Sequence, residues 1–146
     1  MKIYLDTCSL QRPLDTKNQL RILLEAEAVL GIVALCEANV VELVASDALA
    51  FEVARNPHSM RRVYAEELLM KAKSVVVLET KIEKRAAYFA NQGIRPLDAL
   101  HLASAEAGKA DFLCTCDDQF LKQASKIEDL KTRVVSPLDL IKEIEP

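Results

Sequence analysis

Residues 95–103 read Arg-Pro-Leu-Asp-Ala-Leu-His-Leu-Ala, and the apolar character continues up to Gly108. Pro96 stands where a helix can begin, because its fixed φ suits a first helical turn, and glycine is suited to end one. The segment is apolar almost all round, which is typical of a helix buried on most of its sides. Within residues 97–103, Asp98 is the one charge when His101 is neutral. His101 shares the helix face of Asp98, and we interpret it as a core histidine.

On both sides of this helix, short apolar runs alternate with helical patterns. Strands are predicted at residues 2–5, 40–45, 75–78, 112–115 and 133–135. Helices are predicted over 18–37, 47–55, 60–68, 82–93, 97–107, 119–127 and 137–144, and residues 6–19 are predicted to form a polar, turn-rich segment. Since no hairpin turn joins two strands, the alternation predicts an α/β fold with a mostly parallel sheet covered on both faces.

The apolar spacing within three helices predicts which side of each faces the core. In the helix over 18–37 the predicted face is Leu20, Leu23, Leu24 and Ala28. In the helix over 60–68 it is Met60, Val63, Tyr64 and Leu68. In the helix over 82–93 it is Ile82, Ala86 and Phe89.

The chain has 146 residues, 51% of them hydrophobic, which fits a single domain over residues 1–146. Nineteen Lys and Arg against 22 Asp and Glu give a net charge of −3. That balance excludes a broad basic surface that holds nucleic acid by charge alone, but not nucleic acid reached through a metal ion. No apolar run approaches the roughly 18 residues of a membrane span, and Asp6 interrupts the N-terminal apolar run too early for a secretory signal. We therefore expect a cytoplasmic protein, away from the membrane, with four reduced cysteines. We interpret these cysteines mainly as small buried apolar residues.

Four carboxylates lie in or beside apolar segments: Asp6, Glu52, Asp98 and Asp117. Two of them follow predicted strands, whose carboxyl ends frame the ligand crevice of an open parallel sheet. A buried carboxylate without a partner costs several kcal/mol in a protein. None of the apolar runs beside these acids (residues 3–5, 48–54, 97–103 and 112–115) carries its own Lys or Arg. This favours a hard cation such as Mg²⁺ or Mn²⁺, which takes oxygen ligands and supports phosphodiester hydrolysis by a metal-bound water.

Each acid also has a local explanation. Asp6 can cap a turn, and Asp117 can cap the helix that follows it. Asp98 lies in the first turn of its helix, where a negative charge complements the macrodipole. Glu52 can pair with Arg55 three residues on. Four such positions in one small domain together favour the metal site.

Four segments resemble the PIN-domain family of metal-dependent ribonucleases, especially its small VapC-like toxins. Residues 98–103 (Asp-Ala-Leu-His-Leu-Ala) are similar to the family's most specific motif, and residues 3–7 (Ile-Tyr-Leu-Asp-Thr) resemble its first strand and acid. Residues 46–52 resemble the segment that carries its glutamate, and 115–120 (Thr-Cys-Asp-Asp-Gln-Phe) its T-x-D-x-x-F motif. The chain departs from the family at Cys8, where Asn or Ser is frequent.

The resemblance implies a three-layer α/β/α fold around a mostly parallel sheet of four to five strands. It also implies a divalent-metal-dependent endoribonuclease, the toxin of a VapBC-type toxin–antitoxin system, with RNA as substrate, a small antitoxin as partner and a homodimeric state. Asp6, Asp98 and Asp117 are then expected to bind one or two Mg²⁺ or Mn²⁺ ions. Glu52 is expected to complete the metal shell or to take a proton from the attacking water. Thr115 is expected to orient water or phosphate.

Two other classes of function are alternatives to this one. A non-catalytic binding or regulatory module with the PIN fold stays open, because Cys8 departs from the family and the net charge is negative. A haloacid-dehalogenase-type phosphohydrolase needs a second Asp where Cys8 stands. The chain has no G-x-G-x-x-G or P-loop motif, so dinucleotide and nucleoside-triphosphate chemistry are excluded.

Overall fold

Five parallel strands run through the middle of the computed structural model, which describes residues 1–145. Their order is β3-β2-β1-β4-β5, and each neighbouring pair is parallel. The strands are β1 (Lys2–Leu5), β2 (Glu42–Ser46), β3 (Ser74–Val76), β4 (Phe112–Cys114) and β5 (Arg133–Val135). The predicted α/β class, with a parallel sheet of four to five strands, is confirmed. Pro146, the last residue of the predicted domain, lies outside the described residues.

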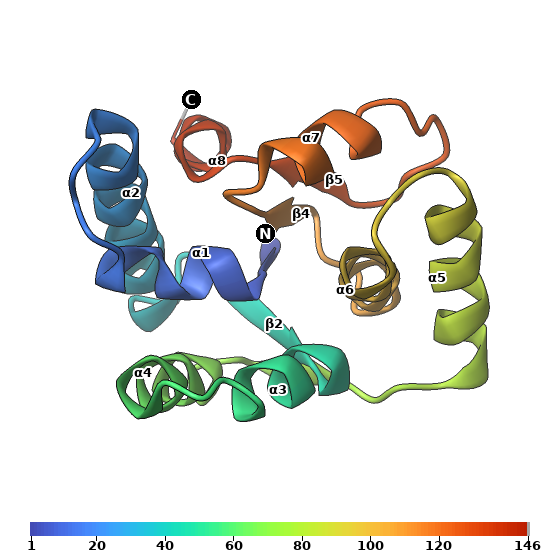
Figure 1. The fold of residues 1–146 in the computed structure, drawn as a ribbon, viewed down its shortest axis with the longest axis horizontal. Coiled ribbons are helices and arrows are strands. Elements are labelled where there is room, and N and C mark those ends of the chain that lie inside the picture. The colour runs from blue at the N-terminus through green and yellow to red at the C-terminus, as the bar shows by residue number, and fades with distance from the viewer. Residues whose placement is uncertain (146) are drawn as a thin grey trace.

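Helices cover both faces of this sheet. They are α1 (Thr7–Gln11), α2 (Leu20–Glu37), α3 (Asp47–Ala54), α4 (Ser59–Leu69), α5 (Thr80–Asn91), α6 (Pro96–Ala107), α7 (Asp118–Ala124) and α8 (Pro137–Ile144), with a 3-10 turn, η1, at Arg12–Leu14. Figure 1 shows α2 and α8 on one side of the central strands and α5 and α6 on the other. Across the described residues, no helix combines the length and apolar character needed to cross a membrane.

Local sequence signals account for the ends of several helices. Pro96 occupies the first turn of α6, and the helix ends at Gly108, as the sequence predicts. The Ser46 hydroxyl accepts a hydrogen bond from the backbone N–H of Leu49 and so caps α3. Ile82, Ala86 and Phe89 are the buried residues of α5, which confirms the predicted face of that helix.

The segment after β1 is helical, so the prediction of a turn-rich segment over 6–19 is wrong for residues 7–14. The Asp6 carboxylate accepts a hydrogen bond from the backbone N–H of Ser9, which caps α1. Leu10 is fully buried by this turn of helix. The cap and the burial of one leucine outweigh a polar composition that is typical of loops.

The predicted faces of α2 and α4 are largely wrong. Leu20 is 71% exposed, Leu23 and Leu24 are exposed as well, and α2 instead buries a face that includes Val29 and Ile32. Met60 and Val63 of α4 are also exposed, whereas Leu68 is buried. Because α2 is apolar almost all round, its spacing fits more than one face, and only its neighbours select the buried one.

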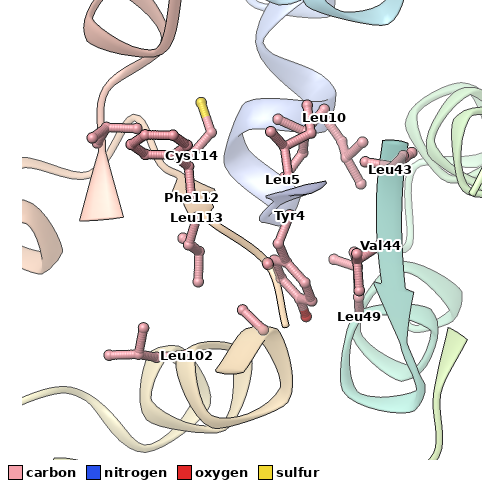
Figure 2. Close-up of a cluster of buried hydrophobic side chains, with 14 of the residues drawn as sticks. Tyr4, Leu5, Leu10, Leu43, Val44, Leu49, Leu102, Phe112, Leu113 and Cys114 are labelled. Carbon is pink, nitrogen blue, oxygen red and sulfur yellow. The ribbon is translucent and has the colours of Figure 1, made fainter. Parts of the chain in front are cut away.

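The central strand, β1, is enclosed on both sides. Ile3, Tyr4 and Leu5 are all fully buried. Figure 2 shows the Tyr4 side chain extending from β1 toward α3 and α6, with its hydroxyl oxygen at the far end. An aromatic side chain whose polar end is buried needs a hydrogen-bond partner there.

The register of β1 and β4 brings their carboxyl ends together. Leu5 lies opposite Cys114, and the backbone N–H of Asp6 donates to the carbonyl oxygen of Cys114 at 3.2 Å. The residues that follow these two strands therefore meet at one edge of the sheet, where open parallel sheets bind ligands.

Candidate active site

A cavity of about 290 Å³ lies at this edge of the sheet. All four acids singled out from the sequence line it, although they come from four separate parts of the chain. The full lining is Asp6, Thr7, Cys8, Glu52, Arg95, Leu97, Asp98, His101 and Asp117.

Asp6 is the most deeply buried of the four acids, at 4% exposure. Its Oδ1 accepts hydrogen bonds from the backbone N–H of Ser9 and from the thiol of Cys8, both at 3.1 Å. Within residues 1–145 no basic side chain forms an ion pair with it. Burial raises the pKa of Asp6 well above its ordinary value. Asp6 therefore favours a proton or a cation nearby.

Glu52 is held in a different way. Its Oε1 accepts a hydrogen bond from the hydroxyl of Thr7 and lies 2.9 Å from His101 Nε2. Burial acts to raise the pKa of Glu52, but the hydrogen bonds from His101 and Thr7 outweigh it and leave the pKa lowered. The predicted local partner, Arg55, instead lies over the ring of Phe51. Glu52 thus stays ionised, with one oxygen tied and the other left for the cavity.

Arg95 lies across the two remaining acids. Its Nε is 3.5 Å from Asp98 Oδ2, and a terminal guanidinium nitrogen pairs with Asp117 Oδ2. Burial raises the pKa of Asp98, and Arg95 opposes that rise. The absence of a basic residue within the four apolar stretches was therefore a poor guide, because Arg95 stands just before one of them.

His101 is 1% exposed, as a core histidine would be, yet it also lines the cavity. Its Nδ1 lies 2.6 Å from the Tyr4 hydroxyl, which in turn lies 2.6 Å from the Ser46 hydroxyl. This connection to Glu52 was not predicted from the sequence. The signal for it was the position of Tyr4, two residues before Asp6 on an inward-facing strand.

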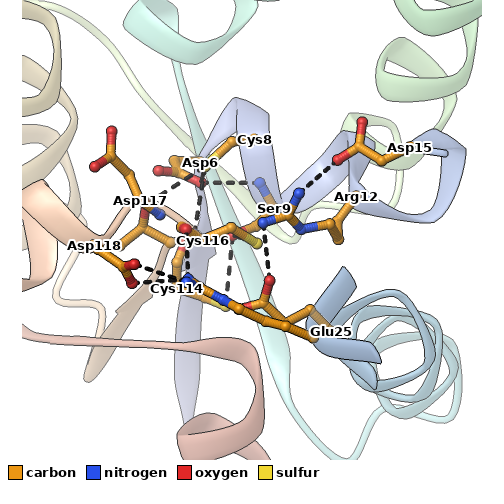
Figure 3. Close-up of polar contacts among 12 residues, drawn as sticks. Asp6, Cys8, Ser9, Arg12, Asp15, Glu25, Cys114, Cys116, Asp117 and Asp118 are labelled. Carbon is orange, nitrogen blue, oxygen red and sulfur yellow. Dashed lines mark hydrogen bonds and ion pairs between the residues drawn. The ribbon is translucent and has the colours of Figure 1, made fainter. Parts of the chain in front are cut away.

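Thr115, at the end of β4, and Cys8, in α1, form hydrogen bonds to Asp117 and Asp6 respectively. Thr115 is fully buried, is absent from the cavity wall, and accepts a hydrogen bond from the backbone N–H of Asp117 at 3.1 Å. Cys8 is exposed, contrary to the interpretation of the cysteines as buried apolar residues. The contact with Cys116 raises the pKa of the Cys8 thiol, which therefore keeps its hydrogen for Asp6. Figure 3 shows Cys8, Cys114 and Cys116 gathered around Asp6.

A second ionic cluster, also not predicted from the sequence, separates Asp118 from the cavity. Arg21 holds both oxygens of Asp118, at 2.7 and 2.8 Å, and the carbonyl oxygen of Cys116 at 3.1 Å. Glu25 is buried because Arg12 and Arg21 both pair with it, and Figure 3 shows Arg12 between Asp15 and Glu25. Of the two neighbouring aspartates, Asp117 lines the cavity and Asp118 is neutralised outside it.

The chemistry of the cavity fits a hard divalent cation. Its metal-ligating groups are the oxygens of four carboxylates, and the buried one, Asp6, has no ionic partner among residues 1–145. A single guanidinium, that of Arg95, faces these four acids. In the described part of the chain, however, no three Asp, Glu, His or Cys groups are gathered as one metal-binding set. A metal ion bound here would compete with Arg95 for Asp98 and Asp117.

A family model for the PIN domain matches residues 3–126. The chain belongs to the PIN domain family. The match covers all four acids of the cavity, and the architecture is the three-layer α/β/α fold that the sequence resemblance implies. PIN domains are generally nucleases.

Solved structures share this PIN fold over nearly the whole chain. VapBC2 from Rickettsia felis, bound to a DNA fragment from its promoter, has 14% identity and a TM-score of 0.59, covering 93% of this chain and 98% of that one. FitAB bound to the IR36 DNA fragment has 19% identity and a TM-score of 0.56, covering 92% and 94%. PAE2754 from Pyrobaculum aerophilum has 15% identity and a TM-score of 0.55, covering 99% and 98%. No curated protein matches the sequence.

Proposed function

We propose that this PIN domain is a divalent-metal-dependent endoribonuclease that hydrolyses RNA phosphodiester bonds, and that it is the toxin of a VapBC-type toxin–antitoxin pair. One observation carries the proposal: four carboxylates, from the ends of β1 and β4 and from α3 and α6, line one cavity. Membership of a family whose domains are generally nucleases supports it.

Asp6, Asp98 and Asp117 would supply the oxygen ligands for one or two Mg²⁺ or Mn²⁺ ions. Such an ion supplies an activated water and stabilises the charge that develops on the phosphodiester. Glu52 offers Oε2 either to the metal shell or to the proton of the attacking water, while its Oε1 stays tied to Thr7 and His101. Thr115 does not line the cavity. It would orient water or phosphate indirectly, because its hydroxyl holds the backbone N–H of Asp117.

A small antitoxin and a second copy of the chain are the expected partners. The structural neighbours VapBC2 and FitAB are toxin–antitoxin assemblies, which supports the antitoxin. The homodimer, like the cytoplasmic location, stays a prediction from the sequence. Light scattering tests the dimer, which would have twice the 16.2 kDa mass of one chain.

RNA cleavage with Mn²⁺ or Mg²⁺ tests the activity. The wild type should cleave RNA, EDTA should stop cleavage, and Asp98→Asn should reduce the rate by about 100-fold or more, since it removes a charge facing the reaction centre. Asp139→Asn removes an equivalent acid from the first turn of α8, away from the cavity, and should leave the rate unchanged. Metal-independent cleavage, or equal rates for the wild type and Asp98→Asn, would contradict the proposal.

A non-catalytic PIN module is the alternative, and one observation favours it. Arg95 already pairs with Asp98 and Asp117, so two of the four acids have a partner without a metal ion. This alternative predicts no RNA cleavage and no rise in Tm with Mn²⁺. A Mn²⁺-dependent rise in Tm that Asp98→Ala removes would count against it.

A further inference from the structure

A run of hydrogen bonds joins four elements behind the acid cavity. It passes from Ser46 at the end of β2 to Tyr4 of β1, then to His101 of α6, and reaches Glu52 of α3. The three distances are 2.6, 2.6 and 2.9 Å. Ser46, Tyr4 and His101 are at most 1% exposed, so water cannot replace these partners. Removing one member would leave the others buried without a partner.

The partners of Ser46 decide which atom is the donor in each hydrogen bond of this run. Its hydroxyl oxygen accepts the backbone N–H of Leu49 at 3.0 Å, and its own hydrogen has one acceptor among the described residues, the Tyr4 oxygen. Tyr4 must then donate its hydroxyl hydrogen to His101 Nδ1. Burial raises the pKa of Tyr4, so the phenol keeps that hydrogen. With Nδ1 as acceptor, Nε2 carries the proton and donates to Glu52.

The other arrangements of protons leave a group unsatisfied. If Nδ1 carried the single proton of a neutral ring, Nε2 would present a lone pair to the ionised carboxylate of Glu52. If both ring nitrogens carried protons, Tyr4 would have to donate to Ser46, whose own hydrogen would then lack an acceptor among the described residues. The neutral Nε2–H tautomer is the one state in which every hydrogen of the run has a partner.

The same run sets the orientation of Glu52. His101 and Thr7 both donate to Oε1, from α6 and α1 respectively, and this fixes a flexible side chain that is otherwise partly exposed. The remaining oxygen, Oε2, is left for the cavity that Asp6, Asp98 and Asp117 also line. Glu52 is thus pre-oriented by residues that do not themselves belong to the acid cluster.

We propose that Tyr4 and His101 are positioning residues for Glu52: the Tyr4 hydroxyl holds His101 as the neutral Nε2–H tautomer, and His101 in turn holds the Glu52 carboxylate in one orientation. The geometric part of this inference stands on the hydrogen bonds alone. Its consequence for catalysis rests on the proposed nuclease function.

Long-range ¹H–¹⁵N NMR of the imidazole nitrogens tests the tautomer without any metal or RNA. The chain has two histidines, and exposed His58 provides a solvent-averaged reference in the same spectrum. At neutral pH, His101 should show a protonated Nε2 and an unprotonated Nδ1. Tyr4→Phe keeps the ring but removes the donor to Nδ1, while Glu52 still holds Nε2–H. In this variant Nδ1 of His101 should show partial protonation, with Nε2 still protonated. Tyr88→Phe, which removes a hydroxyl bound to Asp129, is the control and should leave His101 unchanged.

Three spectral results would overturn the inference: a doubly protonated His101 in the wild type, a protonated Nδ1, or an unchanged His101 spectrum in Tyr4→Phe. His101→Gln, which assigns the signals, also provides a rescue test, because an amide offers both a donor and an acceptor. His101→Gln should retain more Mn²⁺ affinity than His101→Leu. Equal losses in two variants of equal Tm would show that His101 only fills space.

Kinetics separate this inference from the proposed function. Tyr4→Phe should lower Mn²⁺ affinity or kcat about 10- to 100-fold, as is common for residues that orient a metal site from behind, with little change in the KM for RNA. If the wild type neither binds Mn²⁺ nor cleaves RNA, the proposed function fails while the NMR result still decides the tautomer. If the wild type is active and Tyr4→Phe is equally active, the positioning role fails.

Discussion

At the scale of single residues, the cavity contains acids whose pKa values are shifted in opposite directions. Burial raises the pKa of Asp6 and of Asp98, whereas two hydrogen bonds lower that of Glu52. Acids whose pKa values are shifted in opposite directions are typical of sites that both bind a charged group and transfer a proton. The sequence could place all four acids near one another, but it could not give these shifts, since they depend on burial and on donors from other segments.

The raised pKa of Asp6 predicts that the metal-free protein becomes less stable as pH rises. Above about pH 4 the unfolded chain loses this proton, whereas burial makes the folded state keep it, so the free energy of unfolding falls as pH rises toward the folded pKa. Asp6→Asn carries no charge and can still cap α1. In EDTA its Tm should exceed that of the wild type, by a margin that grows from pH 4 to pH 7. A margin independent of pH would contradict this explanation.

Arg95 predicts a competition with metal ions. Its two ion pairs with Asp98 and Asp117 involve a half-exposed side chain, and such pairs contribute about 0.2–1 kcal/mol each. At about 1.4 kcal/mol per factor of ten, Arg95→Ala should tighten Mn²⁺ binding roughly 2- to 30-fold, measured by calorimetry. Arg133→Ala removes a positive charge that pairs with Glu143 on α8 and should leave the affinity unchanged. Weaker Mn²⁺ binding in Arg95→Ala would mean that Arg95 organises the acids and does not compete for them.

At the scale of elements, α6 is the part of the chain that the sequence predicts best. Its start at Pro96, its end at Gly108 and its burial all follow from local signals. By contrast, the exposed leucines of α2 show that an apolar spacing does not select the buried side when the rest of the helix is apolar too. The burial of Glu25 was equally hidden from the sequence, because one of its two partners, Arg12, lies on a different element.

Two of the three glycines, Gly31 and Gly108, predict opposite effects of the same substitution. A Cβ at Gly108 would lie 2.7 Å from Val44 Cγ1 and 2.8 Å from Val76 Cγ2, so Gly108→Ala should destabilise the protein by about 1–3 kcal/mol. A Cβ at Gly31, inside α2, meets nothing within 4 Å, and Gly31→Ala should stabilise it by up to about 1 kcal/mol. Urea unfolding measures both. Similar effects at the two positions would show that α6 is not held tightly against β2 and β3.

At the scale of the whole molecule, one sheet connects every part of the chain. β1 lies at its centre, and the helices that supply the acids, α3 and α6, pack against each other and against β2. The predicted single domain should therefore unfold in one cooperative transition. Far-UV circular dichroism and tyrosine fluorescence should give the same midpoint, since Tyr4 lies in β1 and Tyr88 in α5. Separate midpoints would indicate two independently stable units.

The sequence by itself determined the class of fold, the family and the four acids, because each depends on local patterns: alternating elements, helix caps and short motifs that carry Asp6, Glu52, Asp98 and Asp117. Only the tertiary structure decided what surrounds these acids. Arg95 reaches Asp117, and Tyr4 reaches Glu52 through His101, because the parallel order of the strands brings distant segments to the same edge. The burial of the acids, their charged partners and the donors of their hydrogen bonds all depend on contacts between these distant segments. No single segment of the chain contains that information.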